Sequence, residues 1–235
     1  MSSKLISKVT LTAMTTAVLS AGIGSTSNAA ESDKAAAADY TKMSPEALAE
    51  HLIFKAKGFK LEQPAQEGGL AGKRLEQDET QKICTVLRGK AADAETAEKV
   101  TAMARDSIRY PEGGIQLGDW KIGRELAWSG FGYRIGHKND DHSGAKNGPG
   151  GNCYNCHQLA TDRTGGNIGP TLTGYGKLRG TSEAILKYTY DVIYNANAYF
   201  PCTHMPRMGA NGMLSSEQIS HIMAYLLDPE SPVNK

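Results

Sequence analysis

The chain has 235 residues, which is enough for one domain or for a small domain with a long extension. Lys and Arg total 26 and Asp and Glu total 25, so the formal net charge is +1 at pH 7. This balance argues against a nucleic-acid partner, because phosphate binding needs clustered basic side chains. No apolar run after the N-terminus is long enough to span a membrane.

The N-terminus has the three parts of a secretory signal. Lys4 and Lys8 form its positive part, an uncharged and moderately apolar stretch covers residues 9–23, and Ser27-Asn28-Ala29 provides small residues for a signal peptidase. We therefore expect residues 1–29 to be a signal peptide cleaved near Ala29, and the mature protein to be periplasmic. No cysteine directly follows the cleavage point, which argues against a lipoprotein.

Residues 30–118 are predicted to form a helical N-terminal extension that begins with an Ala-rich flexible leader. Ser44 followed by Pro45 is a typical helix start, with Ser as the N-cap and Pro in the first turn. Apolar residues at helical spacing predict three helices, over residues 45–58, 80–87 and 94–110, with a turn-rich break at 63–72.

Residues 119–235 are predicted to form a second domain. A short helix starts at Trp120, and its small residues permit the close approach of another helix. A glycine-rich, charged loop follows over residues 132–151. Ser215 and Gln218 have the spacing of a capping box, and the amphipathic helix that they begin ends at Asp228-Pro229.

The motif Cys153-Tyr154-Asn155-Cys156-His157 is the strongest signal in the chain. A C-x-x-C-H sequence is typical of covalent haem c attachment: Cys153 and Cys156 would form the two thioethers, and His157 would ligate the iron. A zinc half-site or a redox dithiol would be the alternatives, but a second ligand pair and a strand-to-helix context are both missing from the sequence. With a helix before the motif and one at the C-terminus, the sequence predicts an all-α fold, a class I cytochrome c domain with one haem.

The second axial ligand should come from further along the chain. Met205-Pro206 lies on a loop between Pro201 and Gly209. A thioether is a soft ligand, and His/Met coordination raises the reduction potential. We therefore expect Met205 to be the distal ligand; the alternatives are Met208, Met213 and His204.

Ile168-Gly169-Pro170 is a second supporting feature. His157 should donate its outer ring proton to a backbone carbonyl, which fixes the orientation of the ring and its strength as a ligand. In class I cytochromes a Gly-Pro pair at this distance after the histidine provides that carbonyl, so we expect Pro170 to do so here.

Cys84 and Cys202 remain as an even pair in an oxidising compartment, which suggests a disulfide. Such a bond would tie the extension to the Met205 loop and add a few kcal/mol of stability. The alternative is two independent buried thiols.

Four segments together resemble SoxX, the monohaem subunit of the SoxAX cytochromes of thiosulfate oxidation: residues 151–157, 168–170, 205–209 and the ending 226–234. The likeness runs from about Trp120 to the C-terminus, and it departs from the family at Met208, where an aromatic residue is expected.

The resemblance to SoxX implies a heterodimer with a SoxA-like haem subunit that carries the catalytic cysteine of an L-cysteine S-thiosulfotransferase. This chain would then contribute no catalytic residue. It would accept electrons as thiosulfate is coupled to a cysteine of the carrier SoxYZ, and pass them to a small soluble acceptor such as another cytochrome c. The alternatives are a free periplasmic electron carrier that donates to a terminal oxidase, and a haem-based sensor.

Overall fold

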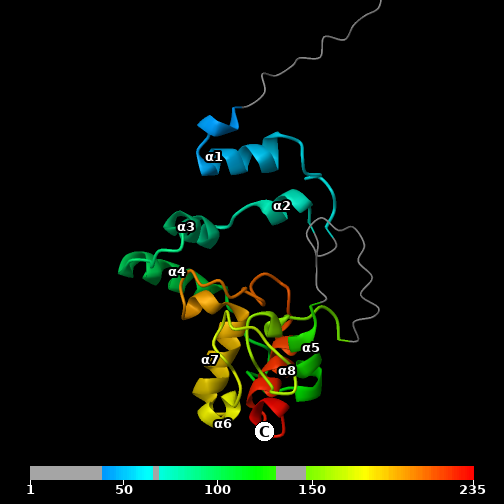
Figure 1. Cartoon of the computed structure of the whole chain (residues 1–235). Helices are drawn as coiled ribbons and strands as arrows, with labels where there is room; N and C mark the ends of the chain where they lie inside the picture. The colour runs from blue at the N-terminus through cyan, green and yellow to red at the C-terminus, as the bar shows by residue number, and fades with distance from the viewer. Residues whose placement is uncertain (1–38, 66–68, 131–146) are drawn as a thin grey trace, which may run out of the picture. The chain divides into compact units, whose positions relative to one another are not determined.

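The computed structural model describes residues 39–65, 69–130 and 147–235, and these segments are helical, without a strand (Figure 1). The expected signal peptide and most of the expected glycine-rich loop lie outside the described residues. The chain divides into two units, Met1–Met43 and Ser44–Lys235. In the first, Asp39 caps a single 3-10 turn, Tyr40–Lys42. All other elements of the described residues belong to the second unit.

Helix α1, Pro45–Glu50, begins where the sequence predicts, because the Ser44 side chain accepts a hydrogen bond from the Ala47 amide. It continues as a π-helical turn, His51–Lys55. Helix α3, Glu79–Leu87, has a capping box formed by Asp78 and Gln81. Helix α4, Ala94–Ser107, ends three residues earlier than predicted, because Ile108 has an extended backbone.

One further helix, α2, Ala71–Leu75, starts inside the segment that we expected to be turn-rich, so that prediction was partly wrong. The helix begins there because the Gly72 amide donates to the Leu61 carbonyl at 2.9 Å. A Cβ at Gly72 would lie only 3.2 Å from the Leu61 Cβ, so a glycine permits this return of the chain.

The second half of the chain is built around two crossing helices, α5, Trp120–Trp128, and α8, Ser216–Leu227, which lie side by side in Figure 1. At the crossing, Gly123 of α5 faces the backbone of His221: a Cβ there would overlap the His221 carbonyl and lie 3.0 Å from the Ile222 amide nitrogen. The absence of a side chain at Gly123 therefore sets the distance between the helices. Both helices, the capping box at Ser215 and the all-α fold confirm the sequence predictions.

Two helices between the motif and the distal loop were not anticipated: α6, Tyr175–Arg179, and α7, Glu183–Tyr194. Helix α7 buries Tyr190 and Ile193 against α8, at a spacing that was visible in the sequence. The buried apolar residues that the two crossing helices share with α7 and the loops include Leu126, Leu159, Tyr190, Ile222, Met223, Tyr225 and Leu227.

The last residues of the chain pack into this core. They form a 3-10 turn, Pro232–Asn234, in which Val233 is fully buried. The Asn234 amide group donates to the Leu226 and Asp228 carbonyls at 3.0 and 2.9 Å, and its carbonyl oxygen accepts from the Gly176 amide at 2.8 Å. One side chain thus joins the end of α8 to the start of α6.

Candidate haem site

The C-x-x-C-H motif forms one tight turn at the end of α5. A 3-10 turn, Cys153–Asn155, is followed by the His157 amide donating to the Cys153 carbonyl at 2.9 Å. Two backbone hydrogen bonds, Gly151 N to Leu126 O at 2.8 Å and Asn152 N to Ser129 O at 3.0 Å, fasten the turn to α5. The motif is therefore positioned by the helix before it.

Cys153 and Cys156 are free thiols, and both are half-buried. Loss of hydration at this position raises the pKa of the Cys153 thiol to about 12, so the thiol is neutral at physiological pH. Two reduced cysteines separated by one turn are the arrangement that thioether attachment requires.

The His157 ring is held in one orientation. Its Nδ1 lies 2.7 Å from the Pro170 carbonyl oxygen, and because a carbonyl only accepts, Nδ1 carries the proton. Nε2 is then the nitrogen with a free lone pair, which is the form that ligates a metal. Gly169 covers one face of the ring: a Cβ there would lie 2.5 Å from Nδ1 and 2.8 Å from Nε2.

Tyr154, between the two cysteines, anchors the motif to α8. Its hydroxyl lies 2.7 Å from the Tyr225 hydroxyl and accepts from the Ala160 amide at 3.2 Å. Trp128 packs edge-on against its ring, with 5.3 Å between centroids. Sequence reasoning assigned Tyr154 no role, and its only sequence signal is its place inside the motif.

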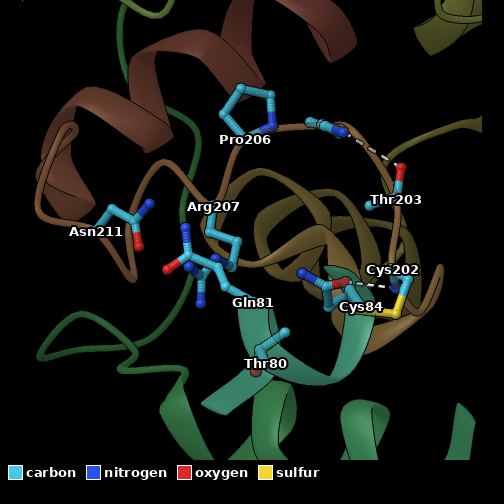
Figure 2. A pocket seen from close by; sticks show the side chains of 10 residues that line it. Thr80, Gln81, Cys84, Cys202, Thr203, Pro206, Arg207 and Asn211 are labelled. Atoms are coloured by element: carbon cyan, nitrogen blue, oxygen red, sulfur yellow. Dashed lines mark hydrogen bonds between the residues drawn. A yellow bond between two sulfur atoms is a disulfide. The ribbon is translucent and has the colours of Figure 1, made fainter. Parts of the chain in front are cut away.

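The Met205 loop lies on a separate part of the structure. Met205 is half-buried and lines a cavity of about 230 Å³, which Figure 2 shows from close by. Met208 is only 8% exposed and packs in the main hydrophobic core, where its carbonyl accepts from the Met213 and Leu214 amides. His204 is exposed. Of these residues, Met205 is the one that lines this cavity.

The two remaining cysteines meet beside the same cavity. Cys84 of α3 and Cys202 form a disulfide, with 5.3 Å between their Cα atoms and 118 residues between them in sequence. The Arg207 guanidinium also pairs with the Asp78 carboxylate at 2.7 Å. The structure therefore brings Cys153, Cys156, His157 and Pro170 together in one place, and Cys84, Cys202 and Met205 in another.

These residues fit a covalent haem. The thiols are free, Pro170 keeps the proton on Nδ1 of His157 so that Nε2 can ligate the iron, and the missing Cβ at Gly169 lets the ring lie in that orientation. Next to Gly169, Ile168 is 77% exposed, which gives the large apolar cofactor a side chain to pack on. In the described part of the chain, no three His, Cys, Asp or Glu side chains are grouped as a metal-ion site would need.

Comparison with known proteins agrees with this reading. The family model of cytochrome c matches residues 144–228. The chain thus carries a cytochrome c domain, and this implies one covalently bound haem c and an electron-transfer function.

A protein of Aquifex aeolicus (strain VF5), described as an uncharacterized lipoprotein, is 40% identical to this chain over 163 residues, which cover 68% of this chain and 73% of that protein. This chain belongs to the same family. Among its described residues, no helix is long and apolar enough to cross a membrane. The first cysteine of the chain is Cys84.

Proposed function

We propose that this protein is the SoxX-like monohaem subunit of a SoxAX L-cysteine S-thiosulfotransferase. It accepts electrons as thiosulfate is oxidatively coupled to a cysteine of the SoxY carrier. The observation that carries the cytochrome part of this proposal is the His157–Pro170 contact beside two free thiols. The thiosulfate part is supported by the four SoxX-like segments, of which the last, residues 226–234, is hydrogen-bonded into the core and is buried at both of its ends.

In this proposal Cys153 and Cys156 would attach the haem, and His157 and Met205 would ligate its iron. The haem, when bound, supplies one-electron chemistry. Pro170 keeps the proton on Nδ1 of His157 and so leaves Nε2 to ligate the iron. The Met205 thioether favours the reduced state and raises the potential.

The partners follow from the same proposal: a SoxA-like haem subunit in a heterodimer, SoxYZ as the carrier that meets the complex, and a small soluble cytochrome as the acceptor. The protein would act in the periplasm, after removal of the signal peptide, residues 1–29. N-terminal sequencing of the protein purified from its host tests the export step, with a mature end near Ala30 as the expected result.

Co-purification and substrate-dependent reduction test the function. The mature protein is purified from its native host, and elution with a second haem subunit is expected. Adding thiosulfate together with the reduced SoxYZ carrier should then reduce the haem, and omitting the carrier should stop the reduction. A lone monomer that is inert to thiosulfate but is rapidly oxidised by a terminal oxidase would move the function to a free electron carrier.

The distal ligand has a test of its own. Met205→Ala should abolish the sulfur-to-iron charge-transfer band of the oxidised protein. Met208→Ala is the matched variant: it should keep the band but lose about 2–5 kcal/mol of stability, because Met208 is a core side chain. A band that survives in Met205→Ala and disappears in Met208→Ala would reassign the ligand to Met208.

A further inference from the structure

The loop that carries Met205 is fastened at both ends to one helix of the N-terminal extension. Cys202, before Met205, is bonded to Cys84 of α3. Arg207, after Met205, pairs at 2.7 Å with Asp78, the N-cap of the same helix. The Arg207 side chain is only 15% exposed, so this ion pair is shielded from water on one side. Helix α3 thus holds the segment 202–207 by one covalent contact, the disulfide visible in Figure 2, and by one ionic contact at Arg207.

The loop has a strained backbone at the residue that carries the disulfide. Cys202 has a φ of +61°, a left-handed conformation that residues other than glycine rarely adopt. Its amide donates to the buried Asn197 side chain at 2.7 Å, and the Met205 amide donates to the Thr203 hydroxyl at 3.3 Å. A strained backbone of this kind persists only where the surrounding structure holds it. Here the disulfide to α3 is part of what holds it.

A pocket separates part of α3 from the loop. The cavity of about 230 Å³ lies between them, lined by Thr80, Gln81 and Cys84 from α3 and by Met205, Pro206 and Arg207 from the loop. A cavity of this size removes the dispersion contacts that a close-packed interface would have. The disulfide and the ion pair are therefore the contacts that join the loop to α3 across this pocket.

We propose that α3 is the positioning element of the distal haem ligand, with Asp78 and Cys84 as positioning residues that keep Met205 on the iron. The proposal rests on Met205 as that ligand. A dithiol reductant exchanges with the Cys84–Cys202 bond, leaving two thiols on the protein and a disulfide on the reductant. The covalent contact of the loop with α3 is then lost and only the ion pair at Arg207 joins the two, so Met205 spends part of its time off the iron. Both the charge-transfer band and the reduction potential decrease, because Met ligation supports both.

The test uses the holoprotein in three forms: untreated, reduced and alkylated at Cys84 and Cys202, and Asp78→Asn. After alkylation the reductant is removed and the haem is reoxidised; the thioethers of Cys153 and Cys156 are not disulfides and stay intact. The readouts are the charge-transfer band, the reduction potential, and hydrogen exchange of the amides between residues 200 and 213. We expect partial loss of the band, a lower potential and faster exchange in both altered forms.

Asp93→Asn is the matched control. Asp93 caps α4 through the Thr96 amide, as Asp78 caps α3, and Asn is an equally good N-cap in both places. Only the Asp78 change removes a charge from the Arg207 pair, so only it should alter the band. An unchanged band and potential in the alkylated form and in Asp78→Asn would overturn the proposal, and so would faster exchange without any change in the band. Loss of the band in Met205→Ala verifies the ligand independently.

Discussion

Gly169→Ala should disturb the proximal ligand without touching the iron or the cysteines. The added Cβ would lie 2.5 Å from Nδ1 and 2.8 Å from Nε2 of His157. Ordinary contact distances between such atoms are about 3.5 Å, so the ring has to move by roughly 1 Å. Its hydrogen bond to Pro170, now 2.7 Å, would then exceed the length at which such bonds form.

The free-energy cost of Gly169→Ala can be bounded in two ways. Loss of one hydrogen bond costs about 0.5–1.5 kcal/mol. Loss of an outer partner of a metal-bound histidine typically costs about 10–100-fold in affinity or activity, which corresponds to roughly 1.4–2.7 kcal/mol. We therefore expect a weaker iron–His157 bond, seen as a shifted potential and a larger high-spin fraction, and a lower haem content per purified chain.

Absorption spectra, potentiometry and a haem-to-protein ratio measure these quantities. Gly130→Ala is the matched control, because its Cβ would meet the nearest atoms, those of the Asn152 side chain, at 3.4 Å or more. The control should behave as the wild type. A Gly169→Ala protein with unaltered spectrum, potential and haem content would refute the reasoning, because His157 could not then be held between Gly169 and Pro170 as the structure has it.

Three further predictions concern the fold. Gly123→Ala should lower the free energy of unfolding, measured in urea, by at least about 1–3 kcal/mol, because its Cβ would overlap the backbone of α8 at His221. A urea midpoint equal to that of the wild type would contradict the tight crossing of α5 and α8. Asn234→Ala should cost at least about 2 kcal/mol by the same assay, because it leaves buried backbone groups unpaired. Burial first, and then the bond to Tyr154, raises the pKa of Tyr225, so the unfolded chain ionises near pH 10 before the folded one. Stability should therefore decrease as the pH rises above about 10, and decrease less in Tyr225→Phe; equal alkaline losses in both would count against this assignment.

The sequence predicts those elements whose cause is local. Ser44 before Pro45 and the Ser215–Gln218 capping box mark the starts of α1 and α8, and the structure has both. The C-x-x-C-H motif predicts the haem-attachment segment in the same way, since its chemistry depends on spacing along the chain. Helix α7 was not predicted, although Tyr190 and Ile193 recur in it at helical spacing.

Other features depend on residues that are far apart in the sequence. The Asp78–Arg207 pair, the Tyr154–Tyr225 hydroxyl contact and the overlap of Gly123 with α8 each join distant segments. Neither the periodicity nor the spacing of residues along the sequence indicates such a contact. The C-terminal end of α4 was misplaced for a similar reason: the helix stops where Ile108 becomes extended and buried, and not at the next proline.

The bond between Cys84 and Cys202 closes a ring of the backbone that contains α4, α5, the C-x-x-C-H motif and α7. A single proteolytic cut anywhere between residues 85 and 201 leaves both fragments covalently joined. A denaturing gel without reductant would show such a nicked molecule as one band. With reductant it would separate into two, and haem staining would follow the fragment that contains Cys153 and Cys156.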